Sequence, residues 1–210
     1  MAIFVNTLFL HDVNINIDSI ISILFIIIAI TDYKSDILKV KNYKKLNINK
    51  VLLFFIIVII SLIITYINDY ITYNYFDDEL KNDIPKSDIC YSHSLVDAIN
   101  AGVSEELVFR LLIFNIILIK YLKIDINKSI IISSILFGLS HINQYISYGT
   151  NLNSSIVNII QAIPVGMLYC YLYVNTNLTT AIIAHFLIDY IDFIFLRCNK
   201  DIYKKMLFIN

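Results

Sequence analysis

The sequence predicts an all-α fold, a polytopic transmembrane helical bundle of about six spans. Of its 210 residues, 58% are hydrophobic and 16% are charged, and the mean hydropathy is +0.72. A soluble domain carries about 25% charged residues because its surface faces water. The chain has only 4 glycines and 2 prolines, so little of it is expected to be loop. These observations predict an integral membrane protein with the lipid bilayer as its main partner.

The expected spans follow from the apolar runs. A helix needs about 20 largely apolar residues to cross a hydrocarbon core of about 30 Å. The longest stretch without Asp, Glu, Lys or Arg runs from Ser129 to Ile188. We expect it to break near residues 147–155 and 174–179, which are rich in Asn, Ser, Thr or Gly. The expected spans are 17–31, 51–68, 103–119, 129–146, 156–173 and 179–196.

Lysines indicate the orientation of the bundle. The segment 33–50 contains six lysines and is expected to be cytoplasmic, whereas the mostly acidic segment 69–88 would lie outside. Lys120, Lys123 and Lys128 then mark a return to the inside. Six spans place the C-terminal tail outside although it is basic, so the tail and the loop charges disagree.

Net charge and cysteine spacing exclude two kinds of chemistry. A net charge of −1 leaves no basic excess to neutralise phosphates, so nucleic acid is not an expected partner. The three cysteines lack metal-type spacing, and Cys170 and Cys198 lie in apolar sequence. Both are expected to be small packing residues, and the chemistry is not expected to rest on thiols.

A cluster of ionisable residues occupies SEELVFR, residues 104–110. Such side chains are costly inside a membrane and usually have a function. Glu106 and Arg110 share a helix face and are expected to pair, whereas Glu105 points about 100° away. A simpler interpretation is an interfacial helix start, capped by Ser104, with both glutamates at the positive end of the helix dipole.

Two further clusters contain histidine. In FGLSH, Phe137 lies one turn before His141 and can pack against its ring. In HFLID, His185 and Asp189 share a helix face. Structural interpretations stand beside these: a histidine that bonds neighbouring helices, and a polar pair that joins two helices.

Together the clusters predict one site. Glu105 lies near the start of one expected helix and His141 near the end of the next, so antiparallel packing places both at similar depth. His185 can approach them if the last helix tilts. A carboxylate and two imidazoles in a dry cavity suit the activation of water, with the imidazoles sharing proton transfer or binding a metal.

The order of EELVFR, FGLSH and HFLID resembles the CAAX-protease and bacteriocin-processing (CPBP, Abi) family of intramembrane peptidases. The resemblance covers about residues 97–196 and implies a catalytic core in the last four helices. It also implies hydrolysis of a peptide bond in a membrane-associated peptide or protein, of the CAAX type or of a bacteriocin maturation or immunity type.

The resemblance implies a role for each matched residue. Glu105 would activate water with the help of His141, while His185 and Asp189 would hold the oxyanion side. Residues Glu106, Arg110 and Phe137 would support them, the ion pair fixing the helix start. Many members carry asparagine at the position of Asp189, and an ionised aspartate cannot donate to an oxyanion. The cofactor stays open: a divalent metal such as zinc would take Glu105, His141 and His185 as ligands.

We expect three parts: N-terminal transmembrane helices and loops at 1–95, the peptidase core at 96–198 and a basic tail at 199–210. The cytoplasmic membrane of a bacterium is the expected location. Two other functions use the same buried groups. One is an ion or metal carrier, and the other is a catalytically silent membrane scaffold.

Overall fold

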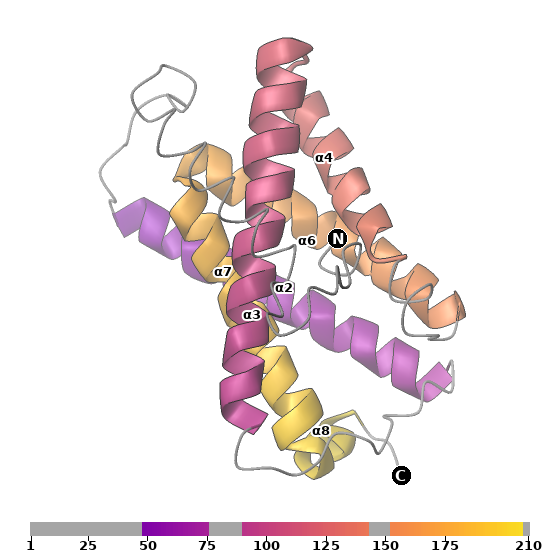
Figure 1. Cartoon of the computed structure of the whole chain (residues 1–210). Coiled ribbons are helices and arrows are strands. Elements are labelled where there is room, and N and C mark those ends of the chain that lie inside the picture. Colours follow the sequence, from indigo (N-terminus) through magenta and orange to yellow (C-terminus); the bar gives the residue numbers. More distant parts are fainter. Residues whose placement is uncertain (1–47, 76–89, 143–151, 208–210) are drawn as a thin grey trace, which may run out of the picture.

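The computed structural model describes residues 48–75, 90–142 and 152–207 (Figure 1). These residues form helices and no strand, which confirms the predicted all-α bundle. Helix η2 continues α3, and η3 continues α7, so each pair forms one long rod. The elements are α2 (Ile48–Tyr75), α3 (Cys90–Glu106), η2 (Leu107–Tyr121), α4 (Ile126–Ser140), α6 (Leu152–Asn175), α7 (Leu178–Phe193), η3 (Ile194–Cys198) and α8 (Lys200–Met206).

Three helices are long and apolar enough to cross a membrane: Ile48–Tyr75, Leu152–Asn175 and Leu178–Leu196. They match three expected spans, and the shorter apolar helix α4 matches a fourth. The expected span at 17–31 lies outside the described residues. The total number of spans therefore stays a prediction.

The helix expected at 103–119 starts earlier than the sequence predicts. It begins at Cys90 because α3 packs along α7 and its polar first half is thereby part of the bundle. The backbones are close at Gly102, where an added Cβ would lie 3.0 Å from the backbone nitrogen of Phe186. A glycine lets two helices approach in this way.

Small residues also join α4 to α6. The pairs Ser134–Gly138 and Ala162–Gly166 have the spacing of small residues at helix contacts. A Cβ on Gly166 would lie 2.9 Å from the ring of Phe137 and 3.4 Å from Ser134. This close contact brings the end of α4 against the middle of α6.

A disulfide joins Cys90 at the start of α3 to Cys198 at the end of η3, with the two Cα atoms 5.8 Å apart. The expectation that Cys198 is a packing residue is therefore wrong. The antiparallel packing of α3 and α7 brings the two cysteines together, and sequence spacing did not indicate that contact. Cys170 is a free, buried cysteine, as expected.

Candidate active site

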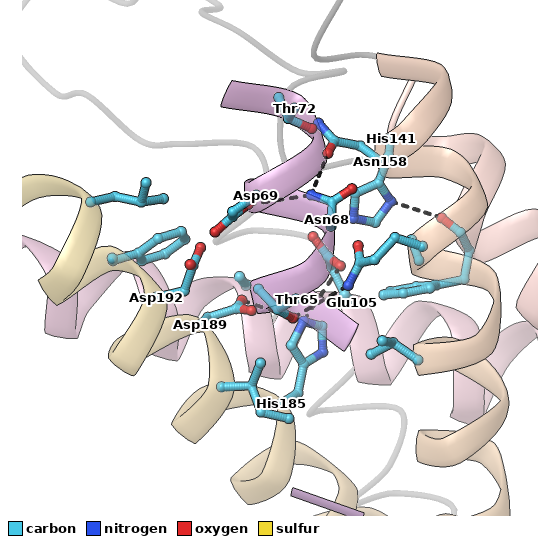
Figure 2. A pocket seen from close by; sticks show the side chains of 18 of the residues that line it. Thr65, Asn68, Asp69, Thr72, Glu105, His141, Asn158, His185, Asp189 and Asp192 are labelled. Carbon is cyan, nitrogen blue, oxygen red and sulfur yellow. Dashed lines mark hydrogen bonds and ion pairs between the residues drawn. The ribbon is translucent and has the colours of Figure 1, made fainter. Parts of the chain in front are cut away.

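A cavity of about 360 Å³ lies among α2, α3, α4, α6 and α7 (Figure 2). The four residues that the sequence predicts as catalytic all line it: Glu105, His141, His185 and Asp189. They come from three different helices or helix ends, as expected. Polar side chains of α2 and α6 complete the wall (Figure 2).

Behind the cavity, Glu106 and Arg110 form the predicted ion pair, with Oε2 and Nε 3.0 Å apart and both side chains 0% exposed. The Nε–H group of Arg110 is not aligned with Oε2 of Glu106 for a hydrogen bond, so this contact is an ion pair alone. The guanidinium donates from Nη2 to the carbonyl of Gly166 at 3.2 Å. It also lies over the Phe137 ring at 4.6 Å and near the Tyr169 ring at 5.5 Å. The pair is thus held from three sides.

This ion pair does not fix a helix start. It lies where the α-helical turns of α3 give way to the π-helical η2, 16 residues after Cys90 in sequence number. Ser104 does not cap a helix either, because its hydroxyl donates to the carbonyl of Asn100 at 2.6 Å inside α3. The interfacial helix start is therefore wrong, since the polar residues before it are themselves helical.

His185 contacts carboxylates on both sides of its ring. Nδ1 lies 2.9 Å from Oε1 of Glu106, while Nε2 lies 3.3 Å from Asp189 and 3.8 Å from Glu105. The ring stacks on Tyr169 with centroids 4.8 Å apart. A neutral imidazole donates from only one nitrogen, so carboxylates on both sides suit the doubly protonated ring.

His141 has a different environment at the end of α4. Its Nδ1 lies 3.0 Å from the carbonyl oxygen of Phe137, and this nitrogen must donate because a carbonyl only accepts. In the neutral ring, Nε2 then carries the lone pair. The ring packs edge-on against Phe137 at 5.1 Å, which confirms the predicted contact.

The model of the family "Type II CAAX prenyl endopeptidase Rce1-like" matches residues 90–191. These residues belong to the Rce1-like family. No curated protein and no solved structure matches the chain. The Rce1-like segment contains every residue predicted as catalytic or supporting, from Glu105 to Asp189. The apolar helices and the match of residues 90–191 to a membrane-protease family together indicate an integral membrane protein.

The use of a metal ion at the Rce1-like site stays a prediction. Among the described residues, no three His, Cys, Asp or Glu side chains are placed to hold one ion. Both ring nitrogens of His185 face carboxylates, and Nδ1 of His141 donates to a carbonyl. Nε2 of His141 thus keeps a free lone pair, whereas His185 would have to give up a carboxylate contact to join the expected ligand set of Glu105, His141 and His185.

The sequence prediction missed two parts of the site. Tyr169 covers one face of His185, and nothing in its spacing marks it. The second part is α2, whose Asn68 and Asp69 line the cavity although they precede the Rce1-like segment. Asn68 donates to Asn158 of α6 at 2.8 Å, which joins the two walls. The signal for α2 was available, because Asp69 ends an uncharged run of a membrane helix.

Proposed function

We propose that the chain is an intramembrane endopeptidase that hydrolyses a peptide bond of a membrane-associated peptide or protein. The observation that carries the proposal is the convergence of Glu105, His141, His185 and Asp189 on one cavity inside a bundle of apolar helices. The Rce1-like family supports the reaction class.

Glu105 is the proposed general base. Its side chain is 15% exposed and lines the cavity, whereas the neighbouring Glu106 is 0% exposed and pairs with Arg110. A water in the cavity gives its proton to Glu105 while its oxygen bonds to the carbonyl carbon of the substrate. Nε2 of His141 carries a lone pair toward which the same water can be oriented. Glu105 then returns the proton to the leaving amine as the C–N bond breaks.

His185 is the proposed oxyanion donor. When water adds to the carbonyl, the C=O electrons move to oxygen, and a preorganised N–H near that oxygen stabilises the charge. Nε2 of His185 faces the cavity side, near Glu105, and Nδ1 is fixed by Glu106. Asp189 is then a positioning residue that holds the imidazolium, a role open to a carboxylate that cannot itself donate.

The test uses the full chain purified in lipid nanodiscs. Quenched peptides, including prenylated ones, are incubated with wild type, Glu105→Gln and His141→Ala, with and without chelator. Asp97→Asn is the matched control, because this half-buried carboxylate of α3 does not line the cavity. We expect cleavage to fall at least about 100-fold in both site variants and to persist in the control.

Two outcomes refine or refute this proposal. Loss of wild-type cleavage with chelator, restored by added metal, would overturn the metal-free route while keeping the peptidase. If both site variants fold normally and cleave like wild type, the catalytic role of Glu105 and His141 is wrong.

A further inference from the structure

Residues 199–207, which we call the C-terminal strap, connect two walls of the cavity. The strap contains α8 and follows η3 (Figure 1). Two side chains of α2 hold its far end. Tyr66 donates to the carbonyl of Met206 at 2.8 Å, and Asn74 donates to the carbonyl of Leu207 at 3.0 Å. The stretch of α2 between these two donors lines the cavity, so the strap ends against one cavity wall.

The disulfide fixes the near end of the strap. Cys198, the last residue of η3, is bonded to Cys90 at the start of α3. Ser94, one turn after Cys90 and 0% exposed, donates its hydroxyl to the Cys198 sulfur at 3.9 Å, because a disulfide sulfur carries no hydrogen. Leu196, two residues before Cys198, lines the cavity. The disulfide therefore holds η3, and with it a second part of the cavity wall, against α3.

The groups proposed for catalysis are held by other contacts. Glu106 lies 2.9 Å from Nδ1 of His185 and pairs with Arg110 at 3.0 Å. Along the helix from Cys90 to Glu105 the rise is about 22 Å, at 1.5 Å per residue. Breaking the disulfide is therefore expected to release η3 and the strap while the contacts around His185 stay in place.

The two sulfurs of the disulfide differ in their exposure. Cys90 is 7% exposed, whereas Cys198 is half-buried. Exposed disulfides are the labile ones, because exchange requires that a thiolate reach a sulfur. A dithiol thus attacks Sγ of Cys198, the S–S bond breaks, and the Cys90 sulfur leaves as a thiolate and takes up a proton. The second thiol of the reductant then displaces Cys198, so that two electrons and two protons pass from the dithiol to the protein.

We propose that the Cys90–Cys198 disulfide is a redox-sensitive latch for the C-terminal strap. In the oxidised form the strap runs from α3 to α2 and fixes two parts of the cavity wall relative to each other. A dithiol reductant frees η3 from α3, and the wall near Leu196 loosens. Substrate binding weakens, whereas the chemical step is kept. The effect on substrate rests on the proposed peptidase function, and the release of the strap does not.

Hydrogen–deuterium exchange of the full chain in nanodiscs tests the latch directly. The protein is equilibrated with mixtures of oxidised and reduced dithiothreitol. We expect exchange in residues 194–207 to rise about tenfold or more on reduction, with no change in α4. Cys90→Ser should show the fast exchange in every mixture. Cys170→Ser, the matched control, removes a free and buried cysteine and should keep the wild-type response.

The far end of the strap supplies a second variant. Tyr66→Phe combined with Asn74→Ala removes both donors of α2 and leaves the disulfide intact. Exchange in residues 203–207 should then rise in the oxidised form, while residues 194–198 stay protected until reduction. Equal exchange of the strap in oxidised and reduced wild type would overturn the latch. A rise on reduction that is as large in α4 would also overturn it, because the disulfide would then brace the whole bundle.

Kinetics connect the latch to the proposed reaction. On reduction, wild type is expected to show a KM about fivefold higher with kcat unchanged within about twofold, and Cys90→Ser should match the reduced protein in every mixture. A fall in kcat at constant KM would overturn the effect on substrate binding. If no form cleaves a peptide but exchange of the strap responds to reduction, the proposed peptidase fails and the latch stands.

Discussion

Replacement of Arg110 by methionine should be among the most destabilising changes in the bundle. Arg110 and Glu106 are both 0% exposed, and each is the other's ion-pair partner at 3.0 Å. The variant Arg110→Met keeps most of the volume between the Phe137 and Tyr169 rings but removes the charge. Among the described residues, His185 would then be the group left to offset the buried carboxylate of Glu106.

The magnitude follows from this burial. Removal of one partner from a buried ion pair costs about 3–5 kcal/mol, because the other charge stays desolvated. The lost hydrogen bond from Arg110 to Gly166 is part of the same cost. The double variant Glu106→Leu with Arg110→Met removes both charges, and we expect it to recover at least about 2 kcal/mol relative to Arg110→Met.

Reversible unfolding in mixed micelles, followed by circular dichroism, measures these free energies for wild type, both single variants and the double variant. The helical signal suits this chain, which has no tryptophan. Arg110→Lys completes the set, because a lysine keeps the charge but loses the flat stacking on Phe137. A cost below about 1 kcal/mol for Arg110→Met, or strictly additive effects in the cycle, would refute the buried-pair argument.

Three further changes test the packing and the site. Gly138→Ala should lower the unfolding free energy by about 1–3 kcal/mol, because the added Cβ would meet the Ile163 side chain and lie 2.9 Å from the carbonyl oxygen of Ile159. An unchanged free energy would contradict the close packing of α4 and α6. Tyr169→Leu should lower kcat up to about tenfold with KM little changed, because the ring that stacks on His185 is lost. Tyr169→Phe keeps the ring and should retain activity; if both variants lose the same activity, the hydroxyl of Tyr169 is the group that matters. Asp189→Leu should lower kcat about 100-fold and Asp189→Asn less, because asparagine keeps an acceptor toward His185. Equal losses in the two variants would show that only the charge of Asp189 matters.

Contacts within one helix could be predicted from the sequence. The pairs Glu106–Arg110, Phe137–His141 and His185–Asp189 each lie four residues apart, and helix geometry alone places such side chains together. The all-α class followed from composition for the same kind of reason, since backbone groups in lipid must bond within helices.

Contacts between helices could not be predicted in this way. The link from Glu106 to His185 crosses from α3 to α7, and the stack of Tyr169 on His185 crosses from α6. Spacing along one helix says nothing about its rotation or crossing angle against another. For the same reason the disulfide of Cys90 with Cys198 was missed, although each cysteine was visible in the sequence.

The contribution of α2 limits what the family segment can do alone. Asn68 and Asp69 precede residues 90–191, yet they line the same cavity as Glu105 and His185. Gln161 of α6 donates to Thr65 of α2 at 3.3 Å, so this wall is held by polar contacts that have few alternatives in lipid. The groups proposed for catalysis therefore come from the Rce1-like segment, whereas α2 supplies part of the cavity wall. Specificity can then change through α2 while the residues proposed for catalysis stay fixed.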